Sequence, residues 1–420
     1  MNVIVIGSGA REHAICRLVH KSYLCDKLYC FPGNYGISEI AECKNLSKID
    51  EIIKECENLK PDLVIIGPEN YLSENLAGEL RTLGISVFGP DAIGAKLESS
   101  KEFMKKFCNI HSIPTAKSMS FDNFENAKNY IDKNQGPIVV KYDGLAAGKG
   151  VFVCQTSEEA IIACQKIFID KIFNENENKV VIEELLEGRE ISYFTITDSN
   201  SHLNFGSAQD YKRIGDGDTG PNTGGMGTVS PAPILDRDLE EKINDLIVNR
   251  TIDGLKKNEI DFQGVIFFGI MVNNQNEPYL LEYNTRFGDP EIQSISMRLK
   301  SDFLQLLHAA STKNLSYADI EFHSNKKAIC LILATKGYPD QYPKKTSIKN
   351  LKNFENSEDF YIFHAATVKE ENQVLSNGGR VLSIVSLKEE YTDCMKNVYE
   401  VAEKIDWDYK YYRLDIGSNY

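Results

Sequence analysis

The stretch 279–291 (YLLEYNTRFGDPE) constrains the fold of this 420-residue chain most. Its first half predicts a β-strand, in which side chains alternate between two faces. That alternation places Glu282 and Asn284 on one face with Leu280, opposite to Leu281, and about 7 Å apart along the strand. We therefore expect a sheet in which the end of one strand points two oxygen ligands in the same direction.

Two oxygen ligands in this arrangement are typical of a magnesium site. Mg²⁺ usually takes only one or two protein ligands and completes its shell with water or phosphate oxygens. Glu282 and Asn284 therefore predict one or two Mg²⁺ ions, with Mn²⁺ as an alternative. Arg286 continues the alternation of side chains along the strand. The N–H donors of its planar guanidinium group can bind both oxygens of a carboxylate. A lone E-x-N is more often a solvated strand end, but here it continues as R-F-G-D-P-E, which favours the metal site.

Composition and charge disfavour several classes of protein. A chain of this length exceeds one compact core, so two to four domains are expected. The net charge of −14 and the pI near 5.1 disfavour binding to nucleic acid. The ten cysteines form no regular framework, no apolar run is long enough to span a membrane, and a predicted strand opens the chain. We expect a cytoplasmic monomer that binds neither nucleic acid nor membrane.

The N-terminal residues predict a Rossmann-like α/β domain over 1–98. A short apolar strand leads through Gly9 into a helix, an arrangement in which backbone N–H groups can bind phosphate. Glu12 replaces the third glycine of the dinucleotide fingerprint, which disfavours a nicotinamide cofactor, and a plain tight turn is the alternative. Similar loops, one with Asn34 and one with Glu69, follow further strands predicted at 28–31, 63–66 and 87–88.

Two lysines and a glycine-rich hairpin are candidates for phosphate binding. Lys105 lies on a helix predicted to begin after a serine cap, whereas Lys141 ends an apolar strand and is the better candidate. The hairpin 144–150 resembles a P-loop, but its glycine spacing is wrong and a strand follows it. We interpret it as a flexible lid in which Gly148 and Lys149 close over phosphates, with a simple mobile hairpin as the alternative.

A strand at 179–186 and a loop at 209–227 complete the candidate site. The loop contains Asp210 and Lys212, is long and rich in glycine, and lacks the acid spacing of a calcium loop, so we expect it to be functional. Glu190 could accept ribose hydroxyls. An adenine edge could be read by four residues at the strand end, Glu183, Glu184, Leu185 and Leu186.

Residues 326–420 predict a small α+β cap in which the sequence shows no chemistry of its own. Its pattern indicates a final helix at about 389–404 and strands at 328–335, 360–365 and 381–387. Before this region, two strands at 265–272 and 278–284 predict a hairpin that brings Glu282 into a sheet.

The order of these features resembles that of the ATP-grasp superfamily. The shared order is a lysine on a helix, a lysine at a strand end, a glycine hairpin, E-E-L-L and E-x-N. Other motifs, spread over the whole chain, resemble the phosphoribosylamine–glycine ligase family: G-x-G-x-R-E-H at 7–13, P-G-N at 32–34, G-P-E at 67–69, D-G-L-A-A-G-K-G at 143–150, D-T-G-P-N-T-G-G-M-G at 218–227, R-F-G-D-P-E at 286–291, N-G-G-R-V at 377–381 and R-x-D-I-G at 413–417. Ala10 and Thr285 depart slightly from the family pattern.

This resemblance implies an enzyme of de novo purine synthesis. It would use ATP to join glycine to 5-phospho-β-D-ribosylamine through a glycyl phosphate, giving glycinamide ribonucleotide, ADP and phosphate. It also implies a division into a Rossmann-like substrate domain at 1–98, an ATP-grasp region at 99–325 with a mobile lid at about 115–188, and the C-terminal region at 326–420.

The resemblance further implies roles for individual residues. The metal would lie at Glu282 and Asn284, and catalysis would involve Arg286, Asp210 and Lys141. ATP would contact Lys105, Lys141, Gly148, Lys149, Glu183, Glu184, Leu185, Leu186 and Glu190. The other substrates would contact Gly9, Arg11, Asn34, Glu69, Asp210, Lys212 and Arg286.

Three alternatives remain at this point. The first is another ATP-grasp carboxylate–amine ligase of purine metabolism, which would share the ATP residues. The second is a non-catalytic nucleotide-binding module, which should have lost Lys141, Glu282 or Asn284, yet all three are present. The third is a nicotinamide oxidoreductase, which Glu12 disfavours. No serine or cysteine lies in a nucleophile elbow, so a covalent enzyme intermediate is not expected.

Overall fold

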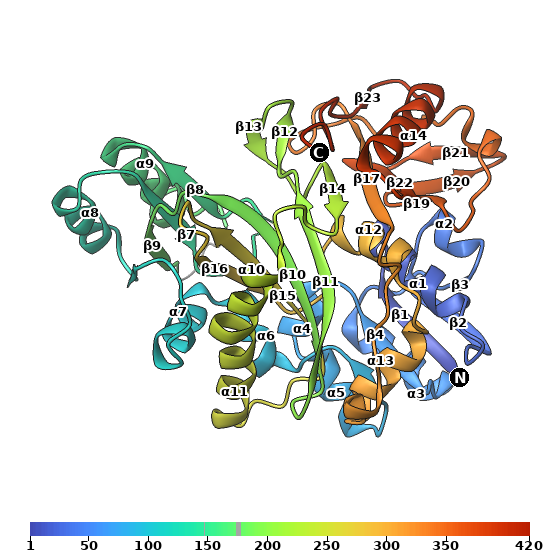
Figure 1. Ribbon diagram of the computed structural model, residues 1–420, viewed down its shortest axis with the longest axis horizontal. Helices are drawn as coiled ribbons and strands as arrows, with labels where there is room; N and C mark the ends of the chain where they lie inside the picture. The colour runs from blue at the N-terminus through green and yellow to red at the C-terminus, as the bar shows by residue number, and fades with distance from the viewer. Residues whose placement is uncertain (147, 174–177) are drawn as a thin grey trace.

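The computed structural model describes residues 1–146, 148–173 and 178–420. In Figure 1 the N-terminal and C-terminal regions lie together on one side, and helices α8 (Phe124–Lys133) and α9 (Ser157–Phe168) lie on the other, with long strands between them. Ala147 of the predicted hairpin and residues 174–177 of the predicted lid lie outside the described residues.

A parallel sheet forms the N-terminal region, as the sequence predicts. Its middle strand is buried from Val3 to Ile6, which is typical of a parallel sheet covered on both faces. The strands, in spatial order and all parallel, are β3 (Glu42–Cys43), β2 (Lys27–Pro32), β1 (Asn2–Gly7), β4 (Leu63–Ile66) and β5 (Val87–Phe88). The helices are α1 (Ala10–His20), α2 (Tyr35–Ser38), α3 (Ile49–Leu59), α4 (Glu69–Ser73), α5 (Leu76–Thr82) and α6 (Ala92–Ser99).

A four-stranded antiparallel sheet packs against α8 and α9. Its strands, in spatial order, are β6 (Ser118–Phe121), β9 (Val180–Glu184), β7 (Ile138–Tyr142) and β8 (Val151–Cys154). The glycine-rich hairpin joins β7 to β8, as predicted. Leu185 and Leu186 lie beyond the end of β9, so the predicted strand 179–186 is shorter at this end. Helix α7 (Lys101–Ile110) begins after Ser100, whose hydroxyl accepts the N–H of Phe103 and caps it as predicted.

A large antiparallel sheet runs through the centre and continues into the C-terminal region (Figure 1). The C-terminal strands therefore extend the sheet that holds the E-x-N strand instead of forming a separate layer. The strands, in spatial order, are β16 (Pro278–Asn284), β15 (Gly264–Val272), β10 (Arg189–Thr197), β11 (His202–Asp210), β14 (Gly227–Ser230), β17 (Lys327–Thr335), β22 (Arg380–Lys388) and β19 (Phe360–His364), and β23 (Lys410–Tyr411) pairs with β17.

Helices cover the central sheet, and two small sheets lie at its edges. The helices are α10 (Arg237–Ile243), a π-helical segment (Asn244–Val248), α11 (Asn249–Lys257), α12 (Glu291–Arg298), α13 (Phe303–Ser311), α14 (Tyr391–Lys404) and two 3₁₀ turns (Leu315–Tyr317 and Leu351–Asn353). The small sheets are β12 (Arg213–Gly215) with β13 (Thr219–Asn222), and β18 (Thr346–Ser347) with β21 (Gln373–Ser376) and β20 (Thr367–Glu370). The predicted irregular loop thus contains the β12–β13 hairpin. No helix among the described residues is long and apolar enough to span a membrane.

The predicted hairpin of β15 and β16 forms, but its alternation is interrupted. Gly269 pairs with Glu282 and Ile270 pairs with Leu280, so Leu281 is an extra residue on β16. A bulge of this kind shifts the side chains that follow it to the other face. Leu280 and Tyr283 consequently pack in one core cluster, although strict alternation placed them on opposite faces. The pair that the prediction needed, Glu282 and Asn284, lies beyond the bulge and still shares a face.

Candidate active site

One cleft of about 740 Å³ brings together residues from all parts of the chain. It lies between the four-stranded sheet, the end of β16, the loops after β4 and β11, and the start of β22. Of the predicted site residues, those that line it are Arg11, Glu69, Lys141, Gly148, Glu183, Glu184, Leu185, Leu186, Glu190, Asp210, Lys212, Glu282, Asn284 and Arg286.

The predicted metal ligands are adjacent in this cleft. The Nδ2 of Asn284 lies 3.4 Å from Oε1 of Glu282, and Arg286 donates to Oδ1 of Asn284 over 3.1 Å. Burial would raise the pKa of Glu282, but Lys212 and Lys141 outweigh it and lower that pKa, so the carboxylate is ionised at neutral pH. An ionised carboxylate beside an amide oxygen fits a divalent cation. Among the described residues no group of three or more His, Cys, Asp and Glu could hold a metal, so phosphate oxygens or water would complete the shell.

Glu183 holds both lysines that were predicted to bind ATP phosphates. Its Oε1 lies 3.2 Å from Nζ of Lys105, its Oε2 lies 3.0 Å from Nζ of Lys141, and all three side chains are buried. Lys105 also donates to the Thr115 hydroxyl and does not line the cleft, whereas Lys141 lines it and donates to the Leu281 carbonyl over 3.1 Å. The Glu183 carboxylate, predicted to face adenine, is engaged in two ion pairs instead.

An apolar part of the cleft lies next to Glu184. The carboxylate of Glu184 accepts the N–H of Lys117 over 2.9 Å, which fixes the end of β9. Glu190, predicted to face ribose, lies 2.6 Å from Nζ of Lys212. Apolar side chains from β7, β8, the segment after β9 and β15 also line the cleft: Val139, Val151, Val153, Leu185, Leu186, Phe267 and Met271. Such a surface suits the face of a flat heterocycle.

Arg286 lies between two carboxylates of the N-terminal region. Its Nη2 is 3.1 Å from Glu98, and its Nε is 3.4 Å from Glu69. Burial opposes ionisation of Glu69, but Arg286 and then Arg11 outweigh it and lower the pKa of Glu69 to about 2. Glu98 is buried more deeply, and burial raises its pKa although the N–H of Thr285 donates to it. The arginine side chain is thereby fixed at the end of β16.

Asp210 presents an unpaired oxygen at the end of β11. Its Oδ1 is buried and has no hydrogen-bond partner in the described part of the chain. Burial, followed by the charge of Glu291, raises the pKa of Asp210 well above its usual value. Glu291 is itself buried and accepts the Ser192 hydroxyl over 3.2 Å. A buried carboxylate without a partner, placed in the wall of a cleft, is suited to a polar or cationic group of a ligand.

Three further predicted residues do not line the cleft. Lys149 is exposed and donates to the Pro339 carbonyl over 3.3 Å. Asn34 caps α2 by accepting the Ile37 N–H, and it donates to the Ser8 and His364 carbonyls. The N–H of Gly9 donates to Glu12 over 2.6 Å, so a carboxylate of the chain itself occupies the start of α1. This explains why Glu12 stands where a dinucleotide-binding helix has glycine.

Several cleft residues were missed by sequence reasoning. Glu98 lies near the end of α6, a helix that was not predicted, Lys101 opens the predicted helix that became α7, and Arg213 belongs to the glycine-rich loop. Three more cleft residues, Asp289, Glu291 and Arg380, lie in motifs that carried the family resemblance, R-F-G-D-P-E and N-G-G-R-V. These motifs could have indicated them as site residues, but no role was assigned to them.

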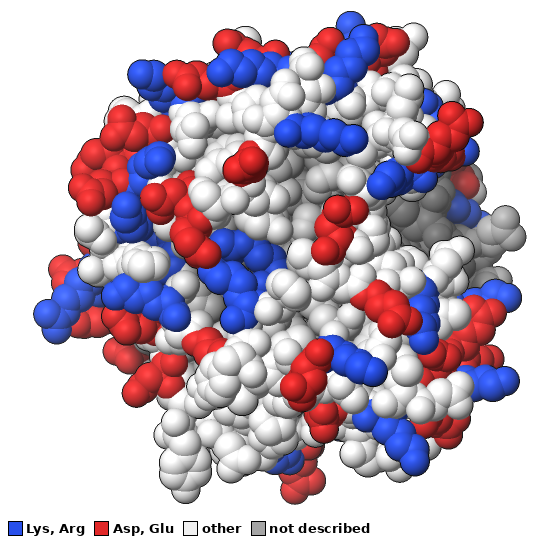
Figure 2. Space-filling view, turned by 90° about the vertical axis from the view of Figure 1, so that its right-hand side faces the viewer, with Lys and Arg blue, Asp and Glu red and all other residues white. Residues whose placement is uncertain are grey.

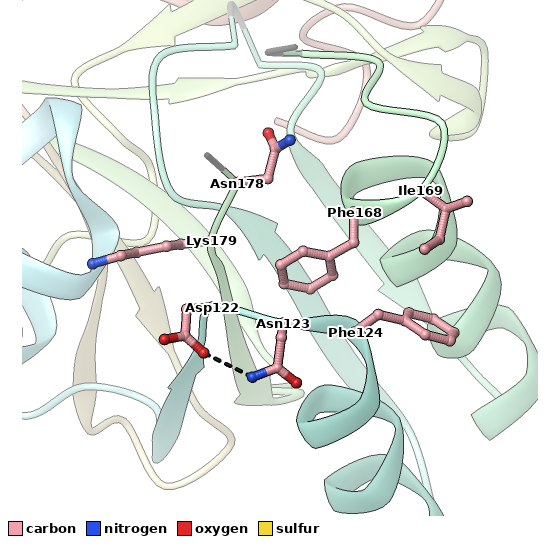
Figure 3. Close-up of a pocket in the computed structure, with 7 residues that line it drawn as sticks. All are labelled: Asp122, Asn123, Phe124, Phe168, Ile169, Asn178 and Lys179. Atoms are coloured by element: carbon pink, nitrogen blue, oxygen red, sulfur yellow. Dashed lines mark hydrogen bonds between the residues drawn. The ribbon is translucent and has the colours of Figure 1, made fainter. Parts of the chain in front are cut away.

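A second cavity of about 500 Å³ lies between α8, α9 and the start of β9, outside this cleft. Figure 3 shows its lining residues at the starts of α8 and β9 and the end of α9: Asp122, Asn123, Phe124, Phe168, Ile169, Asn178 and Lys179. Lys179 extends away from the Phe168 ring and lies 3.1 Å from Glu102 of α7. Neither of the lysines predicted to bind phosphate and neither predicted metal ligand is among its lining residues. On the face in Figure 2, acidic and basic side chains are interspersed, with one group of basic side chains in a central hollow.

Fold and site together define an ATP-grasp enzyme: a parallel N-terminal sheet, a four-stranded sheet with a buried lysine, and a central strand that ends in E-x-N. The biotin carboxylase domain of the 2-oxoglutarate carboxylase from Hydrogenobacter thermophilus has a similar fold, with a TM-score of 0.74, at 14% identity and over 98% of this chain and 91% of that one. The chain matches the phosphoribosylglycinamide synthetase N domain over residues 1–98, the ATP-grasp (A) domain over 99–292 and the C domain over 328–419, and it belongs to this family.

Individual relatives are similar to this chain over nearly its full length. The phosphoribosylamine–glycine ligase of Agrobacterium fabrum is 42% identical over 99% of this chain and 98% of its own length. The chloroplastic enzyme of that name from Arabidopsis thaliana is 41% identical over 97% of this chain and 78% of its own. The crystal structure of the phosphoribosylamine–glycine ligase from Thermotoga maritima superimposes with a TM-score of 0.86, at 31% identity, over 99% of this chain and all of that one.

Proposed function

We propose that this chain joins glycine to 5-phospho-β-D-ribosylamine, with ATP as the energy source, and forms glycinamide ribonucleotide, ADP and phosphate. One observation supports this most: Glu282, Asn284, Lys141 and Arg286 meet in one cleft of a chain that matches the phosphoribosylglycinamide synthetase family over nearly its whole length.

The first chemical step converts a poor acyl donor into a good one. A carboxylate oxygen of glycine bonds to the γ-phosphorus of ATP, and the bond from that phosphorus to the bridging oxygen breaks, with its electron pair leaving on ADP. We assign to Lys141, which lines the cleft, the neutralisation of charge on the transferred phosphoryl group. A divalent metal held by Glu282 and Asn284, with Mg²⁺ or Mn²⁺ as our candidates, would supply charge stabilisation to the phosphate oxygens.

The second step forms the amide bond. The neutral amine of phosphoribosylamine bonds to the carbonyl carbon of glycyl phosphate, and the carbon–oxygen bond to phosphate breaks. The proton that the nitrogen loses leaves with the phosphate, so atoms and charges balance. We assign Arg286, Asp210 and Lys212 to the positioning of glycine and phosphoribosylamine, together with Arg11 and Glu69 from the N-terminal region. Catalysis then rests on positioning and on exclusion of water from the cleft.

The ATP site follows from the same arrangement. We propose that adenine lies against the apolar residues beside Glu184, Leu185 and Leu186, that Glu190 faces the ribose, and that Gly148 and Lys149 belong to a lid at about 115–188 that closes on the phosphates. Lys105 and Glu183 would act behind Lys141, by setting its charge and position. Gly9 and Asn34 would shape the phosphoribosylamine side through the backbone of their loops.

Other properties of the chain remain proposals of the same kind. We propose three functional regions at 1–98, 99–325 and 326–420, a cytoplasmic monomer, and no role in nucleic-acid binding. The interspersed charges in Figure 2 and the net charge of −14 support the last point.

Substrate-omission assays test the proposed activity. With Mg·ATP, ADP release should require both glycine and phosphoribosylamine generated in situ, and the product should have the mass of glycinamide ribonucleotide. ADP release that is indifferent to glycine would point to another carboxylate and would overturn the assignment. ATP binding without turnover under any combination would indicate a binding module.

A further inference from the structure

Arg380 joins the two loops that flank the proposed acceptor site. It opens β22 in the C-terminal region, its side chain is 19% exposed, and it lines the cleft. One guanidinium nitrogen donates to the carbonyls of Gly224, Gly225 (3.3 Å) and Asp289 (2.7 Å). The other lies 3.3 Å from Oδ2 of Asp289. A single side chain therefore ties the end of the glycine-rich loop to the turn that follows Arg286.

The segment that Arg380 holds also fixes Asp210 and Lys212. The N–H of Thr223 donates to the Lys212 carbonyl over 2.8 Å, and the N–H of Met226 donates to Tyr211 over 2.8 Å. The backbone 223–227 therefore pairs with the residues that follow β11. Any displacement of this segment would move the Asp210 carboxylate and the Lys212 ammonium with it.

Gly225 shows how closely the two loops approach. Its φ is +108°, and a Cβ there would lie 2.4 Å from Cδ of Pro290 and 2.7 Å from Oδ1 of Asp210. Only glycine fits such a position without displacing its neighbours. The unpaired oxygen of Asp210 thus lies against the segment that Arg380 fastens to Asp289.

Tyr338 completes the attachment from the same C-terminal region. Its hydroxyl accepts the N–H of Gly224 over 3.0 Å, while Arg380 binds the carbonyl of that residue. The turn that contains Tyr338 follows β17, and its ring lies where a Cβ on Gly379 would be. Both polar groups of the Gly224 backbone are therefore bound by side chains of the C-terminal region.

From these contacts we infer that Arg380 is a positioning residue for the acceptor side of the reaction, with Tyr338 as its partner, and that the C-terminal region contributes to catalysis through them. This inference rests on the proposed function. Arg380 sets the distance between Asp210 and Lys212 on one loop and Arg286 on the other, and it leaves the ATP side unchanged. Misplacement of reacting groups by about 1 Å can lower a rate by roughly 100-fold, so a bridge of this kind has kinetic consequences.

Kinetics of Arg380→Gln test the inference. We expect kcat/KM for glycine and for phosphoribosylamine to fall about 10- to 100-fold, while the Kd for ATP changes by less than about twofold. Arg380→Lys should show nearly the same fall in kcat/KM, because one ammonium group cannot bind three carbonyls and a carboxylate in a fixed plane. Arg237→Gln, at an exposed arginine of α10, is the control and should behave as wild type. An equal loss for ATP and for glycine, or no loss for either, would overturn the inference.

Hydrogen exchange of the segment 215–230 separates this inference from the proposed function. Exchange there should rise in Arg380→Gln and, less strongly, in Tyr338→Phe, which removes one hydroxyl and keeps the ring. Tyr338→Phe also serves if Arg380→Gln fails to fold. If wild type lacks ligase activity but exchange rises in both variants, the proposed function fails and the loop attachment holds. Unchanged exchange in Tyr338→Phe and in Arg380→Gln would refute the attachment.

Discussion

Oε2 of Glu183 lies 3.0 Å from Nζ of Lys141, between strands β9 and β7 of the four-stranded sheet. The other oxygen of the same carboxylate lies 3.2 Å from Lys105. Because Glu183 is only 3% exposed, its carboxylate is the counter-charge of both lysines. This relationship gives Glu183 a role in charge balance that the E-E-L-L motif alone did not indicate.

Glu183→Gln should lower the free energy of unfolding by about 3 kcal/mol, since it leaves two buried ammonium groups without their counter-charge. Mg·ATP should recover part of this loss, because its phosphates supply negative charge near Lys141. Urea denaturation with and without Mg·ATP measures both effects. Glu57→Gln, at an exposed residue of α3, is the matched control. If Glu183→Gln and wild type had the same free energy of unfolding in the absence of nucleotide, the two ion pairs would contribute nothing to stability.

Glu282→Gln should raise the Mg²⁺ concentration needed for half-maximal turnover by about 10- to 100-fold, because an amide is a weaker ligand than an ionised carboxylate. Removal of metal by EDTA should stop turnover, and added Mg²⁺ should restore it. Glu277→Gln, on the same hairpin but paired with Lys242, controls for a general effect on β16. Normal turnover of Glu282→Gln with an unchanged Mg²⁺ dependence would refute the metal assignment.

Asp210→Asn should make the protein more stable at pH 7 and inactive. Burial and Glu291 raise the pKa of Asp210 in the folded state, so folding becomes less favourable as pH rises from the unfolded value toward the raised one. The amide removes that cost, and a gain on the order of 1 kcal/mol is expected, as at other functional sites. Thermal unfolding at pH 5 and pH 7.5 checks this, because the gain should be larger at the higher pH. A loss of stability at pH 7.5 would contradict it.

Acid should weaken the contact between α1 and β19. His13 accepts the backbone N–H of His364 over 2.9 Å, and Arg17 and Tyr361 also border the histidines. Burial, then His364 and Arg17, lower the pKa of His13 well below its usual value, and burial lowers the pKa of His364 to about 4. Below about pH 6.5 the unfolded chain takes up protons that the folded chain cannot, so stability is full above this pH and declines toward pH 4.

For His364 alone, this linkage predicts a loss of about 2 kcal/mol between pH 7.5 and pH 5. Urea denaturation at the two pH values measures it. His364→Asn should reduce the difference between them, whereas His20→Asn, at an exposed position, should leave it as in wild type. An equal pH dependence in wild type and His364→Asn would exclude the linkage.

Local patterns predicted most of the secondary structure near the site. The apolar run before Gly7 forms a buried parallel strand, Ser100 caps α7, and the hairpin of β15 and β16 brings Glu282 to the cleft. These features depend on contacts within a strand, a turn or a helix end, which a short stretch of sequence specifies. The bulge at Leu281 was not predicted, because it depends on the register between two strands and not on the pattern of one.

What the sequence by itself determined was the class of enzyme, through two lysines, a glycine hairpin, an E-x-N pair and an arginine after it, each recognisable within a few residues. Only the tertiary structure decided which groups of the chain these side chains contact. It placed Glu183 between two lysines, let Glu12 occupy the start of its own helix, and brought Arg380 across to Gly224 and Asp289. The physical reason is that a charged or polar side chain buried in a fold must be satisfied by whichever groups the folded chain places beside it, and those groups come from segments far apart in sequence.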